Sequence, residues 1–142
     1  MIHLQKAVIA KLRSIQTLAA ATGYSESHLS IAMANPDQEL LKPGIYVELD
    51  VDPLPASDSS QLRRSILSMY VITADRKTGA EIAGIIRDQF YDENGKEKKL
   101  DIGDDKVLCI GSYWESMQNP RWNKDTDCFE TLVVVTVVWS KK

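Results

Sequence analysis

The sequence predicts an α+β domain with a mostly antiparallel sheet of about four to five strands and two main helices packed on one face of the sheet. Two segments carry apolar residues at helical spacing, and four others carry the alternating or continuous apolar pattern of strands. Short connections between successive strands favour antiparallel pairing. The 142 residues fit a single domain, spanning residues 1–142, that folds without a metal or a disulfide.

The first helix is expected over residues 2–21. Its apolar residues recur every three or four positions and form one stripe, made by Leu4, Val8, Leu12, Ile15 and Ala19. Gly23 follows as a helix stop. Residues 24–44 are ambiguous, because the alternation around residues 29–34 hints at a short edge strand but also fits a helical turn.

Two strands are expected on either side of a polar loop. Residues 45–52 alternate, with apolar side chains on one face and Tyr46, Glu48, Asp50 and Asp52 on the other. Residues 53–61 contain two prolines and three serines, which is typical of an exposed loop. Residues 62–73 form a longer strand that is apolar on both faces from Ile66 onward.

A second helix is expected over residues 79–91. Thr78 and Glu81 have the spacing of a capping box, in which the threonine hydroxyl binds the Glu81 amide. Residues 92–105 then carry six acidic and three basic side chains around Asn94-Gly95. This composition predicts a long, solvated loop that either binds a partner or is disordered.

Two strands, 106–117 and 127–140, close the chain and are expected to form a hairpin that turns near residue 122. The last strand is β-branched and apolar on both faces, so it should be central and should bury Trp139. In this hairpin Cys109 and Cys128 lie about 20 Å apart along the ladder. A disulfide needs Cα atoms within about 7 Å, so two reduced, buried thiols are expected, as in a cytosolic protein.

Charge and hydropathy exclude several classes of protein. Seventeen Lys and Arg against 20 Asp and Glu give a net charge of -3. Domains that bind nucleic acid through their overall charge are usually basic. No apolar run approaches the roughly 20 residues of a membrane span. The first residues lack the pattern of an export signal. A soluble chain without membrane contact is expected.

Catalytic and metal-binding patterns are weak. His3 and His28 have no cysteine or carboxylate at a metal-ligand spacing, and the glycine positions after Asp92 do not match a calcium loop. Asp50 and Asp52 share a strand face and could share a divalent cation, but a solvated strand end before Pro53 is the favoured interpretation. Trp114 and Trp122 could line a ligand pocket, but aromatic residues in strands are more often core or interface. We therefore expect a binding or assembly protein without a cofactor, not an enzyme.

The element order resembles that of the small tail-terminator, or tail-completion, proteins of tailed bacteriophages and prophages. The resemblance is carried by the helix around Leu4-Gln5-Lys6-Ala7-Val8, the proline-led strand Pro43-Gly44-Ile45-Tyr46-Val47, the serine-rich loop with the long strand 62–73, the helix of Ala80, Ile82, Ile85 and Ile86, and the final strand pair. It spans nearly the whole chain. The insertion of Gly44-Ile45 before Tyr46 and the long loop 92–105 depart from the pattern of the family.

The resemblance implies a homo-oligomeric ring, commonly a hexamer, that caps the tail tube in the virion after assembly in the bacterial host cytoplasm. Its partners would be the tail-tube protein and the head–tail connector, with DNA passing through without specific binding. Strand 62–73 and the loops 53–61 and 92–105 are the expected docking elements, and the candidate interface residues are Glu48, Asp50, Arg63, Arg64, Lys96, Lys98 and Lys99. The alternatives are a head–tail joining protein, the cap of a tail-like bacteriocin, or a small-ligand or protein-binding domain that uses its tryptophans.

Overall fold

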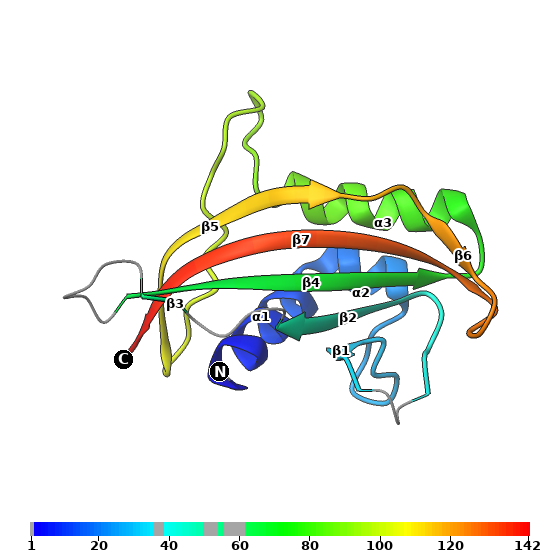
Figure 1. Cartoon of the computed structure of the whole chain (residues 1–142), viewed down its shortest axis with the longest axis horizontal. Helices are drawn as coiled ribbons and strands as arrows, with labels where there is room; N and C mark the ends of the chain where they lie inside the picture. Colours follow the sequence, from blue (N-terminus) through cyan, green and yellow to red (C-terminus); the bar gives the residue numbers. More distant parts are fainter. Residues whose placement is uncertain (1, 36–38, 50–53, 56–61) are drawn as a thin grey trace.

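The computed structural model describes residues 2–35, 39–49, 54–55 and 62–142 and shows a single mixed sheet with helices against it (Figure 1). Five strands follow the order β1-β2-β4-β7-β5, while β3 pairs with β4 and β6 pairs with β7. The α+β prediction is confirmed, and the sheet has more strands than expected because β3 and β6 are short additions. The elements are α1 (Ile2–Ser14), α2 (Gln16–Thr22), β1 (Ile31–Met33), β2 (Gly44–Leu49), β3 (Leu54–Pro55), β4 (Arg63–Thr73), α3 (Arg76–Asp88), β5 (Val107–Met117), β6 (Arg121–Asn123) and β7 (Cys128–Lys141).

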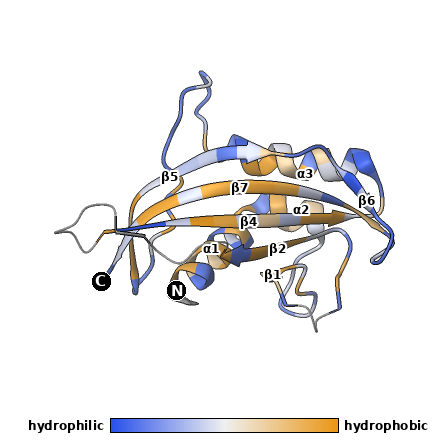
Figure 2. Cartoon of the chain, viewed as in Figure 1, coloured by the Kyte–Doolittle hydropathy of each residue, from blue (hydrophilic) through white to orange (hydrophobic). Residues whose placement is uncertain are grey.

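The main core lies between one face of the sheet and the helices. Alternate residues of β7 enter it, namely Val133, Val135, Val137 and Trp139, together with Leu4, Val8 and Leu12 of α1 and Ile82 and Ile86 of α3. Figure 1 views the sheet from its other side, with the helices behind it. The hydropathy colours of Figure 2 show β2, β4 and β7 as the most apolar strands. As predicted, β7 is a central strand, flanked by β4 and β5.

The N-terminal helix is interrupted at Ile15. The sequence pattern predicts one continuous helix over residues 2–21. Ile15 has φ -81° and ψ 109°, an extended conformation that ends α1 and precedes α2. One residue earlier, the Ser14 hydroxyl donates to the Lys11 carbonyl at 2.6 Å. Such side-chain bonds compete with the helical backbone pattern, and an apolar periodicity does not reveal them. The predicted stop is correct, because Gly23 has φ 69° and its N–H binds the Ala19 carbonyl.

The ambiguous segment contains an edge strand, as the alternation hinted. Strand β1 pairs parallel with β2, and Ile31 lies opposite Ile45. Strand β2 then pairs antiparallel with β4. The predicted loop 53–61 includes the short strand β3, which pairs with the beginning of β4. Residues 50–53 and 56–61, including Asp50 and Asp52, lie outside the described part of the chain.

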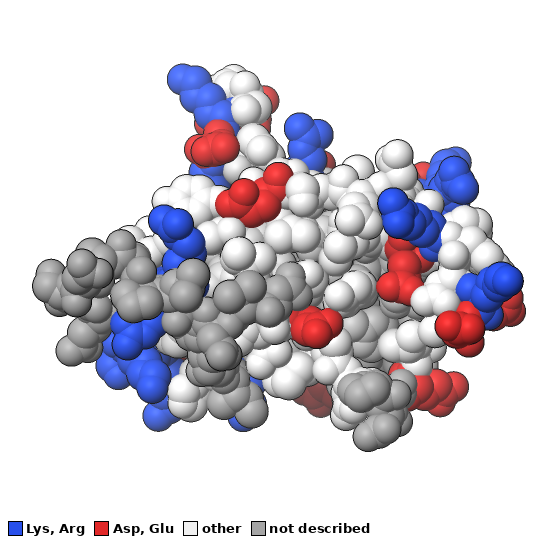
Figure 3. Space-filling view, viewed as in Figure 1, with Lys and Arg blue, Asp and Glu red and all other residues white. Residues whose placement is uncertain are grey.

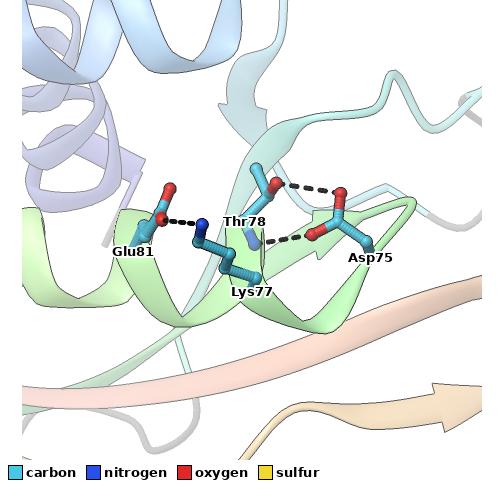
Figure 4. A network of polar contacts seen from close by, with 4 residues as sticks. All are labelled: Asp75, Lys77, Thr78 and Glu81. Atoms are coloured by element: carbon cyan, nitrogen blue, oxygen red, sulfur yellow. Dashed lines mark hydrogen bonds and ion pairs between the residues drawn. The ribbon is translucent and has the colours of Figure 1, made fainter.

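Helix α3 begins earlier than the predicted capping box. Its N-cap is Asp75, whose carboxylate accepts hydrogen bonds from the Thr78 N–H at 2.7 Å and the Thr78 hydroxyl at 3.0 Å (Figure 4). Glu81 instead lies 3.9 Å from Lys77, one turn away on the exposed side of the helix. The prediction failed because an aspartate three residues before the threonine is the stronger acceptor for the first free N–H groups.

The final hairpin has a different register from the predicted one. Its turn lies at residues 124–127, where Asn123 Oδ1 accepts from the Asp125 N–H at 3.0 Å and Asp127 has φ 52°. The expected turn residues 121–123 form β6, which pairs with β7. Two irregularities in β5 shift the pairing further, so Cys109 lies opposite Trp139, about 35 Å along β7 from Cys128. Both thiols are free and buried, as expected.

The predicted solvated loop 92–105 has two parts. Residues 92–99 are exposed and form an arm that stands out from the body of the domain (Figure 1). Leu100 and Ile102, in contrast, are buried in the main core. The Leu100 N–H and carbonyl both bind the Ser112 hydroxyl at 2.8 Å, which fixes this part of the loop against β5. The expectation of a wholly solvated loop is therefore wrong for its second half.

Candidate functional site

No catalytic or metal centre is evident among the described residues. They contain no group of three or more His, Cys, Asp or Glu side chains placed to hold a metal ion. The two carboxylates considered for a divalent cation, Asp50 and Asp52, are outside the described ranges.

None of the described helices is both long and apolar enough to cross a membrane.

The face of the sheet opposite the helices is a candidate interaction surface. We call it the open face; it carries Tyr46 and Glu48 of β2, Arg64, Ile66, Tyr70 and Ile72 of β4, Leu132, Val134 and Val138 of β7, and Tyr113 of β5. Five of these side chains are half-buried, namely Ile66, Tyr70, Leu132, Val134 and Val138, while Tyr46 and Ile72 are buried. Figure 3, which views this face, shows mainly uncharged atoms across its middle with acidic side chains among them. A half-buried apolar face rimmed by charge is typical of an interaction surface.

A groove crosses the open face near β1 and β2. We call it the Tyr46 groove; it has a volume of about 440 Å³ and is lined by Ala34, Asn35, Leu40, Tyr46, Glu48, Tyr70, Ile72 and Glu130. The Tyr46 hydroxyl accepts from the Leu41 N–H at 2.6 Å and donates to the Leu41 carbonyl at 3.2 Å. Burial raises the pKa of Tyr46. The phenol therefore stays neutral and holds the segment beside the groove in place.

A second hollow, of about 340 Å³, adjoins the groove and shares Tyr70 and Glu130 with it. Arg121, Trp122 and Lys124 of the β6–β7 hairpin form its other side. The Glu130 carboxylate accepts a hydrogen bond from the Asn123 side-chain amide. Glu130 is thus fixed between two hollows, with Glu48 as a second carboxylate in the larger one.

A third hollow, of about 220 Å³, lies at the opposite edge of the sheet. It is lined by the aromatic residues Phe90, Tyr91, Tyr113 and Trp114, by Ile110, and by Glu97, Lys98 and Lys99 of the exposed arm. Trp114 contacts Phe90, with ring centroids 6.2 Å apart, whereas Trp122 contacts Phe129 at 5.1 Å. Trp114 and Trp122 line different hollows, so the described residues do not form one pocket that uses both tryptophans.

Exposed apolar side chains concentrate on β5. Of the six large hydrophobic residues that the described chain exposes, four lie on this strand: Leu108, Ile110, Tyr113 and Met117, each 41–47% exposed. Strand β5 is also the last strand of the sheet, bordered only by β7 among the described strands. An exposed, apolar edge strand is a typical site of association with another chain.

The structure separates the expected interface residues into three places. Arg63 and Arg64 lie at the start of β4, but successive strand residues point to opposite faces, and only Arg64 is on the open face. Glu48 lines the Tyr46 groove, and Lys96, Lys98 and Lys99 lie on the exposed arm beside β5. Asp50 lies outside the described residues. Strand β4 is paired on both sides, so strand 62–73 offers a face and an end, not a free edge.

The sequence reading named the charged residues of these surfaces but missed their apolar partners. The sequence pattern did not indicate Leu108, Ile110 or Tyr113 as interface residues. The available signal was the apolar content of a strand next to a charged loop, but which strand forms the edge depends on the long-range pairing.

Comparison with solved structures gives an informative similarity. No protein-family model matches the chain, and no curated protein sequence matches it either. Among solved structures, the chain resembles a chain of the virion of a native gene transfer agent particle, with a TM-score of 0.61 and 18% sequence identity. The alignment covers 97% of this chain and 94% of that one, so the two share one fold along nearly their whole lengths.

Proposed function

We propose that the chain is a structural protein of a phage-like particle and acts as its tail terminator. Copies form a ring, a hexamer in the family it resembles, that caps the tail tube, ends its polymerisation and presents a surface to the head connector. The observation that carries this proposal is the shared fold with a gene transfer agent virion chain over 97% of this chain. The element order that resembles tail terminators supports the same assignment independently.

The surface chemistry suits non-covalent assembly. Contact with another chain removes the apolar open face and the apolar edge strand from water, and this burial favours association. A ring needs heterologous contacts, in which two different patches of the subunit meet. The chain offers two such patches at opposite edges of its sheet, the Tyr46 groove near β1–β2 and the exposed residues of β5.

The net charge of -3 fits a ring that DNA traverses without being bound, since DNA is retained by clusters of Lys and Arg. We place the assembled protein in the virion tail, where it contacts the tail-tube protein on one side and the head–tail connector on the other. The proposal involves no catalytic step and no cofactor.

Tube polymerisation provides the test. The tail-tube protein of the same particle is polymerised alone and with increasing amounts of this chain, and tube lengths are measured by negative-stain electron microscopy. A terminator shortens the tubes in proportion to its concentration and is found at one tube end by gold labelling. Tubes of unchanged length with no bound chain would overturn the terminator assignment.

The same experiment separates the neighbouring functions. A head–tail joining protein would bind connector rings but leave tube length unchanged. Tryptophan fluorescence serves as a control, because a ligand-binding domain that uses Trp114 or Trp122 would respond to small molecules in the absence of tube protein.

A further inference from the structure

We infer that adjacent copies are joined head to tail through two defined surfaces, an inference that rests on the proposed ring. One surface is the β5 edge, which we define as the exposed Leu108, Ile110 and Tyr113 with the neighbouring Lys98 and Lys99. This β5 edge docks on the Tyr46 groove of the next copy. The occupant of the groove is therefore a second copy of this chain.

The β5 edge presents an apolar ridge with a basic border. Leu108, Ile110 and Tyr113 are 45%, 47% and 47% exposed. Lys98 and Lys99 line the same hollow as Ile110 and Tyr113, and Lys99 Nζ lies 3.5 Å from the Cys109 carbonyl. Neither lysine belongs to an ion pair among the described residues, where Lys77–Glu81 is the pair present. Their charges remain available to a partner.

The Tyr46 groove presents the complementary chemistry. Its floor and walls are mainly apolar, from Leu40, Tyr46, Tyr70 and Ile72, and its charged groups are the carboxylates of Glu48 and Glu130. An apolar ridge flanked by two lysines matches an apolar groove that contains two glutamates. Complementary charge of this kind fixes the orientation of two surfaces and disfavours wrong partners.

The positions of the two surfaces allow copies to join into a closed ring. The sheet order β1-β2-β4-β7-β5 places the groove towards one edge and the β5 edge at the other. A contact between different surfaces is heterologous, so each copy keeps one free groove and one free edge until the ring closes. Two copies joined through identical surfaces would stop at a dimer.

A charge exchange between the surfaces tests the inference. The edge variant is Lys98→Glu with Lys99→Glu, and the groove variant is Glu48→Lys with Glu130→Lys. Each alone should raise the concentration needed for assembly at least about tenfold, because like charges then face one another. The variant that carries all four changes should assemble again, as should a mixture of the two double variants, because every contact then joins opposite charges.

Assembly is followed by light scattering after size exclusion, with tail-tube protein present if the wild type requires it. Glu81→Lys, on the exposed side of α3, is the matched control and should assemble like the wild type. Far-UV circular dichroism verifies folding. Since Glu130 binds Asn123, Glu48→Lys alone replaces the groove variant if the double variant does not fold, and it is then paired with Lys99→Glu.

The outcomes are distinguishable. If the wild type forms rings and both variants do so equally well, the inferred contact is wrong while the proposed ring stands. If each variant fails and the combination does not recover, the two surfaces do not face one another, and the inference is overturned. A wild type that stays monomeric with and without tube protein overturns both the ring and this contact.

Discussion

Two glycines of the same helix lead to opposite predictions for the same substitution. Gly79 and Gly84 both lie in α3, where alanine is the better helix former. An added Cβ at Gly84 would meet nothing within 4 Å. At Gly79 it would lie 2.8 Å from Thr131 Oγ1 and 3.0 Å from Thr73 Oγ1, closer than Cβ atoms normally approach. Gly79 is thus a position at which α3 packs directly on the sheet.

The magnitudes follow from these contacts. Gly84→Ala should stabilise the fold by about 0.5–1 kcal/mol through reduced backbone entropy of the unfolded chain. Gly79→Ala gains the same amount but must displace the helix or turn two threonines that are both 0% exposed. The Thr73 hydroxyl donates to the Asp75 carbonyl at 2.7 Å, which resists that rotation. Overpacking costs about 1–3 kcal/mol, so after subtraction of the gain Gly79→Ala should be net destabilising by up to about 2.5 kcal/mol.

Urea unfolding followed by far-UV circular dichroism measures both values. Adding Thr131→Ala removes one obstructing hydroxyl, so Gly79→Ala should cost less in that background than in the wild type. If Gly79→Ala stabilised the protein as much as Gly84→Ala does, the close packing of α3 on the sheet would be refuted.

Further predictions concern buried and capping side chains. Trp139→Ala should cost about 3–5 kcal/mol in urea unfolding, and a loss below about 1 kcal/mol would contradict its place in the core. Tyr46→Phe removes the hydroxyl that holds the segment beside the groove and should cost about 1 kcal/mol in the same assay, whereas wild-type stability would contradict that role. Hydrogen bonds from Thr78 lower the pKa of Asp75, so its contribution to stability is complete above about pH 4 and is lost as pH falls through the lowered value. Asp75→Asn should weaken the dependence of the free energy of unfolding on pH below about pH 4. An unchanged pH dependence would argue against the cap. Cys109 and Cys128 should react with a thiol reagent only after unfolding, because both are buried.

Local patterns predicted most elements of the fold. Three signals each indicate one helix or strand that buries one or both of its faces. They are the Ile82–Ile86 spacing, the alternation from Ile45 onward and the β-branched last strand. These signals depend on near neighbours in the chain. They therefore correctly indicated an α+β domain and a central last strand.

The errors arose where one side-chain bond or one inserted residue decides the geometry. Asp75 captures the amide at the start of α3, so the helix begins before the predicted Thr78 cap. Irregular pairing in β5 between Cys109 and Gly111 and between Trp114 and Ser116 shifts the register of the final strands. Apolar periodicity does not encode either event.

The candidate surfaces were predictable only in part. Glu48, Lys98 and Lys99 were recognised as exposed charges, because isolated charges beside strands are seldom buried. The groove itself joins Tyr46, Tyr70 and Glu130 from three strands, so it exists only after long-range pairing. The same pairing makes β5 an edge strand and turns its apolar residues outward.

The molar mass of the purified chain in solution, measured by light scattering after size exclusion with and without the tail-tube protein, tests the account most directly. The account predicts a closed species of several times 15.9 kDa, formed either by the chain alone or on addition of tube protein. A chain that remains at 15.9 kDa under both conditions and does not co-elute with tube protein would contradict its role as a ring-forming terminator.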